Sequence, residues 1–341
     1  MNKLNQQILV HRYPDGLPAK EHFAFVETPL SEPKEGEISV EVIYLSMDPF
    51  PRLRLNPKGA MPPLPLNSLM ISRGVARVTA SRDVNFQIGD YVAGEVGWQQ
   101  YATVAGTSMR KVDPTLAPIS TCLGVLGPSG IAAYFALLDL GQPKAGETVL
   151  IAAAAGSVGS VACQIAKLKG CRVVGIAGGA IETAYLRDEL KIDAAVDWQQ
   201  ANFAEDLAQA LNSGVDVFFD SVGGKTHDLA MAHLNVHARI ALVGYISAYN
   251  PEGGEPVNYG KILPVIHKRA RMQGFLATDY LDRGVEAMQA LAQWVKNGQI
   301  SYVEDIVVGI DKVPDAFASL FSGFKPGKKL VQLANDPTLN K

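Results

Sequence analysis

The residues with the clearest chemical meaning form a turn in which Ala154, Gly156 and Gly159 follow a short apolar run. Small residues at this spacing let the chain turn sharply, approach a pyrophosphate and pack a helix against a strand. A helix predicted over 158–169 would point its N-terminal amides and positive dipole end at the anion. Because the next strand, at 172–177, follows in register, the pattern indicates a dinucleotide site rather than an ordinary tight turn.

Elements that could position such a site follow each other from residue 147 onward. Apolar runs predict strands that alternate with helical periodicity, as in 202–211 and 280–296. This alternation is typical of a doubly wound parallel α/β sheet with right-handed crossovers. The predicted strands are 149–153, 172–177, 194–197, 216–220, 239–243 and 272–276. An apolar helix over 131–140, closed by Gly141, precedes them.

Residues before about 124 have a different sequence pattern, which predicts many β-strands interrupted by prolines. Short strands are predicted at 37–45, 73–79, 90–96 and 98–104, while the prolines of 61–65 require a loop. This spacing predicts a compact barrel or sandwich. The C-terminal part returns to a strand at 303–310, a helix at 311–321 and a strand at 329–333.

Composition narrows the class of protein. A chain of 341 residues suggests two domains, and 48% hydrophobic with 19% charged residues suits a well-packed globule. A net charge of −3 offers no basic surface for nucleic acid. The first residues lack the apolar core of a secretory signal, and no apolar stretch is long enough to enter a membrane. Cys122, Cys163 and Cys171 have no paired spacing, so we expect a reduced, cytoplasmic protein.

Five motifs together carry a resemblance to a known family. The chain resembles the zinc-independent medium-chain dehydrogenases/reductases, most closely the branch of prostaglandin and leukotriene reductases, alkenal double-bond reductases and bacterial curcumin reductases. The resemblance implies a GroES-like domain over 1–124 and 303–341, a Rossmann domain over 125–302, and a homodimer joined through the Rossmann sheet edges. The motifs are YLSMDP (44–49), TVLIAAAAGSVGSVACQIAKLKGCRVVG (148–175), FFDSVGG (218–224), GYISAYN (244–250) and QGFLATDY (273–280).

No metal site is expected, since zinc-dependent relatives carry a glycine-histidine-glutamate run where this chain has Arg73 in SRGVARV. His233 and His237 are interpreted as turn or surface residues, because a metal needs further ligands.

Without a Lewis acid, alcohol oxidation is hard. Reduction of a conjugated carbonyl is easier, because hydride addition at the β-carbon gives a delocalised enolate that hydrogen bonds stabilise.

Tyr249 is the candidate donor to the substrate oxygen, just past the carboxyl end of the fifth strand, where ligands bind in open α/β sheets. By resemblance, the matching tyrosine lies beside the nicotinamide ribose and the substrate carbonyl, and its hydroxyl would stabilise the enolate. The alternative is a packing tyrosine in a turn. Tyr245 is expected to line the pocket or to pack.

The choice of cofactor depends on the end of the second strand. The run 176–179, which includes Gly178, lacks the acidic residue that binds a free ribose 2′-hydroxyl, and this favours NADP over NAD. The family's usual lysine and tyrosine for the 2′-phosphate align with Glu182 and Trp198. A carboxylate repels a phosphate, so either NAD is also accepted or Glu182 faces solvent in the first turn of the next helix.

Other cofactor contacts are implied by the motifs alone. The resemblance places the pyrophosphate on Gly156, Ser157, Val158 and Gly159, and puts Lys325 where relatives often have asparagine. Ala132 and the pair Phe50-Pro51 replace family residues, so the mouth of the substrate pocket is expected to differ. The implied walls of the adenosine and nicotinamide halves are Ser221, Val222, Val243, Gly244, Tyr245, Ile246, Phe275, Leu276 and Ala277.

The leading hypothesis is therefore an NADPH-dependent reductase of α,β-unsaturated aldehydes or ketones that acts on small molecules, without a metal, a nucleic acid or a membrane. An NADPH quinone reductase of the same superfamily is the enzymatic alternative. A cofactor-binding protein with little turnover is the alternative from another class.

Overall fold

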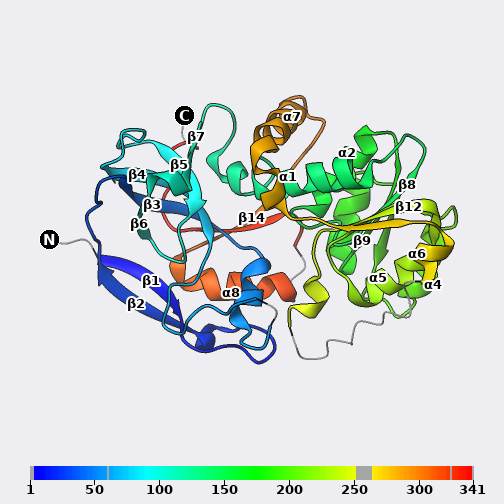
Figure 1. Ribbon diagram of the computed structural model, residues 1–341, viewed down its shortest axis with the longest axis horizontal. Coiled ribbons are helices and arrows are strands. Elements are labelled where there is room, and N and C mark those ends of the chain that lie inside the picture. The colour runs from blue at the N-terminus through cyan, green and yellow to red at the C-terminus, as the bar shows by residue number, and fades with distance from the viewer. Residues whose placement is uncertain (1–3, 60, 251–262, 323–324, 340–341) are drawn as a thin grey trace. The chain divides into compact units, whose positions relative to one another are not determined.

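The computed structural model describes residues 4–59, 61–250, 263–322 and 325–339. It divides into two compact units (Figure 1). The first unit comprises Met1–Leu123, Glu304–Gly323 and Lys329–Lys341, and the second comprises Gly124–Val303 and Phe324–Lys328. The first unit is rich in strands, and the second alternates strands with helices, as the sequence predicts.

The first unit is built on a sheet of order β14-β15-β3-β4-β5-β7, with β6 paired to β3, and on a separate β1-β2 pair. The pairs from β15 through β7, and the β3-β6 pair, are antiparallel. Its core surrounds Trp98, whose ring packs against those of Phe23 and Phe317. The elements are β1 (Leu4–Val10), β2 (Phe23–Pro29), β3 (Glu37–Ser46), β4 (Arg73–Ser81), β5 (Tyr91–Glu95), β6 (Tyr101–Ala105), β7 (Met109–Val112), β14 (Glu304–Val308), α8 (Val313–Ala318) and β15 (Lys328–Gln332).

The second unit contains a six-stranded sheet of order β10-β9-β8-β11-β12-β13, in which every neighbouring pair is parallel. This is the Rossmann strand order, whose direction of winding reverses between β8 and β11. The strands are β8 (Thr148–Ile151), β9 (Arg172–Ala177), β10 (Ala194–Asp197), β11 (Val215–Asp220), β12 (Leu234–Leu242) and β13 (Arg271–Gly274). The helices are α1 (Pro128–Phe135), α2 (Gly159–Leu168), α3 (Gly179–Ala184), α4 (Phe203–Ala210), α5 (Gly224–Met231), α6 (Leu263–His267) and α7 (Gly284–Lys296).

Helices cover both faces of this parallel sheet. Successive side chains of a strand point to opposite faces, so Val149 and Ile151 pack on one side and Leu150 on the other. The first face is covered by α1, α2 and α7, and the second by α4 and α5. Burial on both faces explains the nearly continuous apolar runs by which the sequence predicts these strands.

One prediction about local structure is wrong, namely that Gly141 ends the helix. The helix at 131–140 continues from α1 into a π-helical stretch, η5 (Ala136–Gly141), and the left-handed residue that ends it is Gln142, with φ 47°. Gly141 instead allows close packing, since a Cβ there would lie 2.9 Å from Cγ1 of Val217. The segment 325–328 groups with the second unit, where Gly327 N–H donates to the carbonyl of Ala155 at 2.9 Å.

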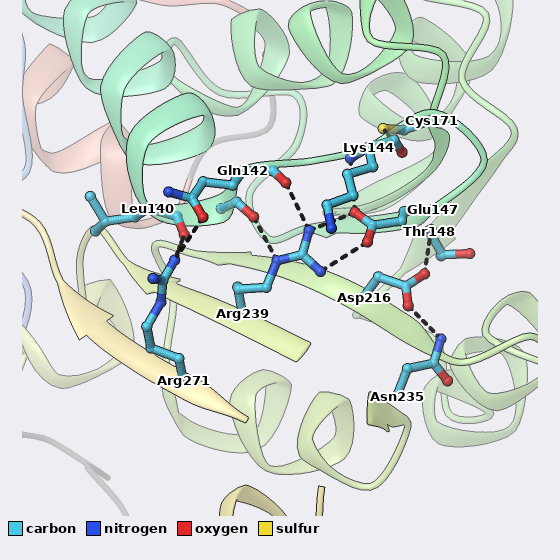
Figure 2. A network of polar contacts seen from close by, with 11 residues as sticks. Leu140, Gln142, Lys144, Glu147, Thr148, Cys171, Asp216, Asn235, Arg239 and Arg271 are labelled. Carbon is cyan, nitrogen blue, oxygen red and sulfur yellow. Dashed lines mark hydrogen bonds and ion pairs between the residues drawn. The ribbon is translucent and has the colours of Figure 1, made fainter. Parts of the chain in front are cut away.

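Arginine side chains tie the end of η5 to the sheet (Figure 2). Arg239 Nε donates to the carbonyl of Gly141 at 2.9 Å, and its guanidinium also bonds the carboxylate of Glu147. Arg271 donates to the carbonyl of Leu140 at 2.7 Å. These arginines satisfy carbonyls that a helix leaves free at its C-terminus, and their charge suits that end of its dipole.

None of the helices in the described residues is long and apolar enough to cross a membrane.

Candidate cofactor and substrate site

The turn between β8 and α2 has the form that a pyrophosphate requires. Gly156 N–H donates to the carbonyl of Ala153 at 3.0 Å, which closes the turn, and α2 begins at Gly159. A Cβ at Gly159 would collide with the carbonyl oxygen of Ala153, so a larger residue would push the helix away. The next strand also stays small, since a Cβ on Gly175 would lie 2.8 Å from Cβ of Ala154. These features fit the phosphates of a dinucleotide.

The predicted cofactor residues gather at the carboxyl ends of the parallel strands, apart from Lys325. They follow β8, β9, β10, β11, β12 and β13 in turn, on the edge of the sheet where such folds bind ligands. Gly156, Ser157, Val158 and Gly159 follow β8, Gly178 and Glu182 follow β9, and Trp198 follows β10. Ser221 and Val222 follow β11, Val243, Gly244, Tyr245, Ile246 and Tyr249 follow β12, and Phe275, Leu276 and Ala277 follow β13.

Glu182 occupies the first turn of α3, where an acid is favourable, but it does not simply face solvent. Its carboxylate accepts a hydrogen bond from Gly178 N–H at 2.8 Å. Burial raises the pKa of Glu182, the hydrogen bond from Gly178 opposes this rise, and the nearby charge of Asp197 adds to it. The partly exposed side chain of Glu182 therefore folds back onto its own helix terminus.

Asp197, at the end of β10, contributes to this edge although no sequence motif singles it out. Its Oδ1 accepts from Gly179 N–H at 2.8 Å and from Gln199 N–H at 3.0 Å. Burial alone would raise the pKa of Asp197, but the bond from Gln200 and these backbone bonds hold it below its usual value. Next to it, Trp198 leaves half of its surface exposed, as a side chain available for stacking would.

The turn after β11 is held by Asp220, which is completely buried. Its Oδ1 accepts from the N–H groups of Val222 and Gly223, each at 2.9 Å, and its Oδ2 lies 2.8 Å from Nδ1 of His227. Ser221 Oγ donates to the carbonyl of Ala152 at 3.2 Å, across the point where the winding of the sheet reverses. No sequence pattern indicates this contact between Asp220 and His227.

Tyr249 lies in the short turn that follows β12. Its N–H donates to the carbonyl of Ile246 at 3.1 Å, after the 3₁₀ turn η7 (Ile246–Ala248). Burial raises the pKa of the Tyr249 phenol, and a hydrogen bond to the Tyr245 backbone works against that rise. A neutral phenol is a hydrogen-bond donor, which is the property that a developing enolate oxygen needs.

The segment after β13 has one buried and one exposed apolar residue. Phe275 is 7% exposed and its ring stacks on Tyr280 with centroids 5.3 Å apart, so it belongs to the core. Leu276 is 63% exposed and is available to a ligand. The guanidinium of Arg283 lies over the Phe135 ring, 4.7 Å from its centroid, and also bonds Asp139 and Glu286. These ring and ion-pair contacts hold the segment after β13 in place.

Lys325 groups with the second unit. The exposed Lys325 precedes by two residues Gly327, which forms a parallel bridge with Gly156 of the glycine turn. A cation near the phosphates of a dinucleotide is favourable.

Within residues 4–59, 61–250, 263–322 and 325–339, no group of three or more His, Cys, Asp or Glu side chains could hold a metal ion.

A Rossmann sheet with a glycine cradle and a tyrosine at its carboxyl edge defines a dinucleotide-dependent oxidoreductase. Residues 6–112 match the family model described as the N-terminal domain of oxidoreductase, and residues 157–297 match the one described as zinc-binding dehydrogenase. The NADPH-dependent curcumin reductase of Escherichia coli is 39% identical, over 97% of this chain and 98% of that protein. The 2-alkenal reductase (NADP(+)-dependent) of Nicotiana tabacum is 34% identical, over 97% and 98%.

A solved structure agrees with these relatives. CurA from Vibrio vulnificus, in complex with NADPH, has a TM-score of 0.92 and 39% identity, over 97% of this chain and 100% of that one. The chain belongs to the zinc-independent branch of the medium-chain dehydrogenases/reductases. Its fold is a Rossmann domain together with a β-rich, GroES-like domain.

Proposed function

We propose that this protein uses NADPH to reduce the C=C bond of α,β-unsaturated ketones or aldehydes. The relatives that reduce curcumin and 2-alkenals span nearly the whole chain, which supports both the reaction and the cofactor. The structural observation that carries the proposal is the place of Tyr249, a half-buried phenol at the same sheet edge as the glycine cradle. A donor is needed there if negative charge develops on a substrate oxygen.

In this proposal, Gly156, Ser157, Val158 and Gly159 hold the pyrophosphate through the backbone and the dipole of α2. Exposed Trp198 flanks the adenosine, and exposed Leu276 flanks the nicotinamide. The remaining strand-end residues, including Ala277, form the walls between them. When bound, NADPH supplies the hydride that adds to the β-carbon of the substrate.

Tyr249 provides the chemistry that the chain itself contributes. As the β-carbon gains the hydride, electron density moves to the carbonyl oxygen, and the phenol donates a hydrogen bond to that oxygen. The α-carbon of the enolate then takes a proton that originates from solvent, which restores the carbonyl and completes the saturated product. A preorganised donor lowers the barrier because it needs no reorientation while the charge forms.

The experiment that tests this function mixes the protein and NADPH with a panel of enones, enals and quinones and follows the loss of nicotinamide absorbance. We expect the enones and enals to be reduced, and product analysis to show a saturated carbonyl compound. Faster reduction of the quinones would favour the quinone reductase instead. Tight NADPH binding without any oxidation would favour a cofactor-binding protein.

We also propose that the protein is a cytoplasmic homodimer joined through β13. In each protomer, residues 1–124 together with 303–341 form one domain, and residues 125–302 form the other. At the outer edge of the parallel sheet, Arg271, Gln273 and Gly274 of β13 are exposed, and so are Leu281 and Val285 beyond it. An open strand with apolar neighbours suits pairing with a second copy. Sedimentation equilibrium should give twice the mass of the chain, and Leu281→Lys should shift it toward the monomer.

A further inference from the structure

The buried carboxylate of Asp220 makes contacts that the mechanism above does not use. Its Oδ1 accepts from the N–H groups of Val222 and Gly223, each at 2.9 Å. Its Oδ2 lies 2.8 Å from Nδ1 of His227, which stands on α5. Because an ionised carboxylate only accepts hydrogen bonds, Nδ1 of His227 is the donor. The anion is thus satisfied by donors from two elements, its own turn and the following helix.

Backbone hydrogen bonds also join the turn after β11 to the segment that carries Tyr249. The carbonyl of Ser221 accepts from Ile246 N–H at 3.3 Å, and the carbonyl of Val222 accepts from Ser247 N–H at 3.1 Å. Tyr249 N–H then donates to the carbonyl of Ile246 at 3.1 Å. A continuous path of hydrogen bonds therefore joins the buried carboxylate to the backbone of the proposed catalytic tyrosine.

Side-chain packing also holds the turn after β11 against the segment that carries Tyr249. Gly223 has φ 72°, and a Cβ there would collide with the ring of Tyr245, so the glycine turn and the aromatic ring fit closely. The carbonyl of Tyr245 accepts from Ala248 N–H at 3.0 Å. A shift of the turn would therefore move both the ring of Tyr245 and the backbone that leads to Tyr249.

We propose that Asp220 and His227 form a positioning pair that sets the place of Tyr249 through the turn 221–223. This inference rests on the proposed role of Tyr249 in enone reduction. Removing His227 would leave the buried carboxylate one donor short, and an unsatisfied buried acceptor is costly enough for the surrounding chain to rearrange. Because catalysis depends on geometry at the scale of 1 Å, such a rearrangement would lower turnover without removing a reacting group.

Hydrogen exchange of the cofactor-free protein tests the path directly. In His227→Ala, we expect the amides of Ile246 and Ser247 to exchange faster, while those of α4 keep their wild-type rates. His227→Asn should restore slow exchange, because the asparagine amide can place a donor close to the position of Nδ1. Lys225→Ala, which changes an exposed side chain on the same helix, is the matched control. Unchanged exchange at Ile246 and Ser247 in His227→Ala would overturn the proposal.

A double-mutant cycle tests whether the pair acts through the phenol. His227→Ala should lower kcat for an enone roughly three- to thirtyfold, within the range expected for a misplaced catalytic group. In the Tyr249→Phe background, the same change should lower kcat by less than about twofold, because coupled residues are not additive. An equal loss in both backgrounds would show that the pair does not act through Tyr249. If no enone is reduced at all, the proposed function fails, while the exchange experiment still decides whether the pair holds the segment.

Discussion

Tyr249 combines burial with a place at the ligand-binding edge of the sheet. Burial raises the pKa of its phenol above the ordinary value of 10.0, although the Tyr245 backbone opposes the rise. Because a phenol is neutral below its pKa, the donor form persists across the physiological range and beyond pH 10. We therefore expect turnover to show no loss from Tyr249 ionisation until the pH exceeds about 10. Rates measured for wild type and Tyr249→Phe from neutral to alkaline pH check this, and an alkaline limb below that range, absent from the variant, would contradict it.

Glu182 gives a second prediction at the scale of one residue. Its carboxylate and that of Asp197 both lie at the sheet edge where a ribose 2′-phosphate would bind, and both accept from the backbone around Gly178 and Gly179. Glu182→Lys should tighten NADPH binding relative to NADH by about 1 kcal/mol, because it exchanges a repulsive charge for an attractive one. Fluorescence titration with both cofactors measures the ratio.

Glu182→Gln is the matched control for that experiment, since it removes the charge and keeps an oxygen for Gly178 N–H. It should produce part of the effect of the lysine. An unchanged ratio in both variants would mean that the 2′-phosphate lies elsewhere.

In the proposed cofactor site, the glycine turn acts as a whole element rather than through one side chain. Gly159→Ala places a Cβ against the carbonyl of Ala153, so α2 must move away from β8. We expect NADPH affinity to fall at least tenfold, since the helix terminus would no longer reach the phosphates. Calorimetric titration measures this. Gly170→Ala serves as a comparison at another position close to α2, and an equal loss of affinity there would contradict the account.

The sequence predicts these elements well where short-range rules decide. Buried parallel strands must be apolar and the cradle must be small, so β9 and β10 have the predicted bounds and α2 differs by one residue at each end. Contacts between distant side chains leave no such pattern. Asp197 resembles any acid in a turn, and the pair Asp220 and His227 depends on how the chain reverses between β11 and α5.

The missed elements have similar causes. The strand β1 reads LNQQILV and mixes polar and apolar residues without strict alternation, so its pairing with β2 supplies the information that the sequence lacks. The helix end at Gln142 is set by the packing of Gly141 against Val217, which sequence rules on glycine caps do not include.

At the scale of the whole molecule, we expect the protein to lose stability when an arginine that joins η5 to the sheet is replaced. Arg239→Met would leave Glu147 and the carbonyls of Gly141 and Gln142 without their guanidinium donor. Because the side chains of Arg239 and Glu147 are only 16% and 20% exposed, the free energy of unfolding should fall by roughly 2–4 kcal/mol. Urea unfolding measures it. Arg187→Met, at an exposed arginine, should change it by less than about 0.5 kcal/mol, and similar losses in both variants would contradict the prediction.

The pH dependence of this difference has a definite sign. Burial alone would raise the pKa of Glu147, but Arg239 and the Lys144 backbone outweigh it and hold the pKa below its ordinary value of 4.5. A carboxyl group with a lowered pKa in the folded state stabilises the protein fully above its unfolded pKa. The difference between wild type and Arg239→Met should therefore be complete above about pH 4.5 and shrink as the pH falls further.

The central claim is that Tyr249 supplies the donor for enone reduction at the carboxyl edge of the Rossmann sheet. Steady-state kinetics of Tyr249→Phe with NADPH and an enone, together with an NADPH titration, test it most directly. The loss of one oxyanion donor predicts turnover lower by roughly ten- to a thousandfold, with cofactor affinity nearly unchanged. An enone turnover equal to that of the wild type would contradict the claim and remove Tyr249 from the mechanism.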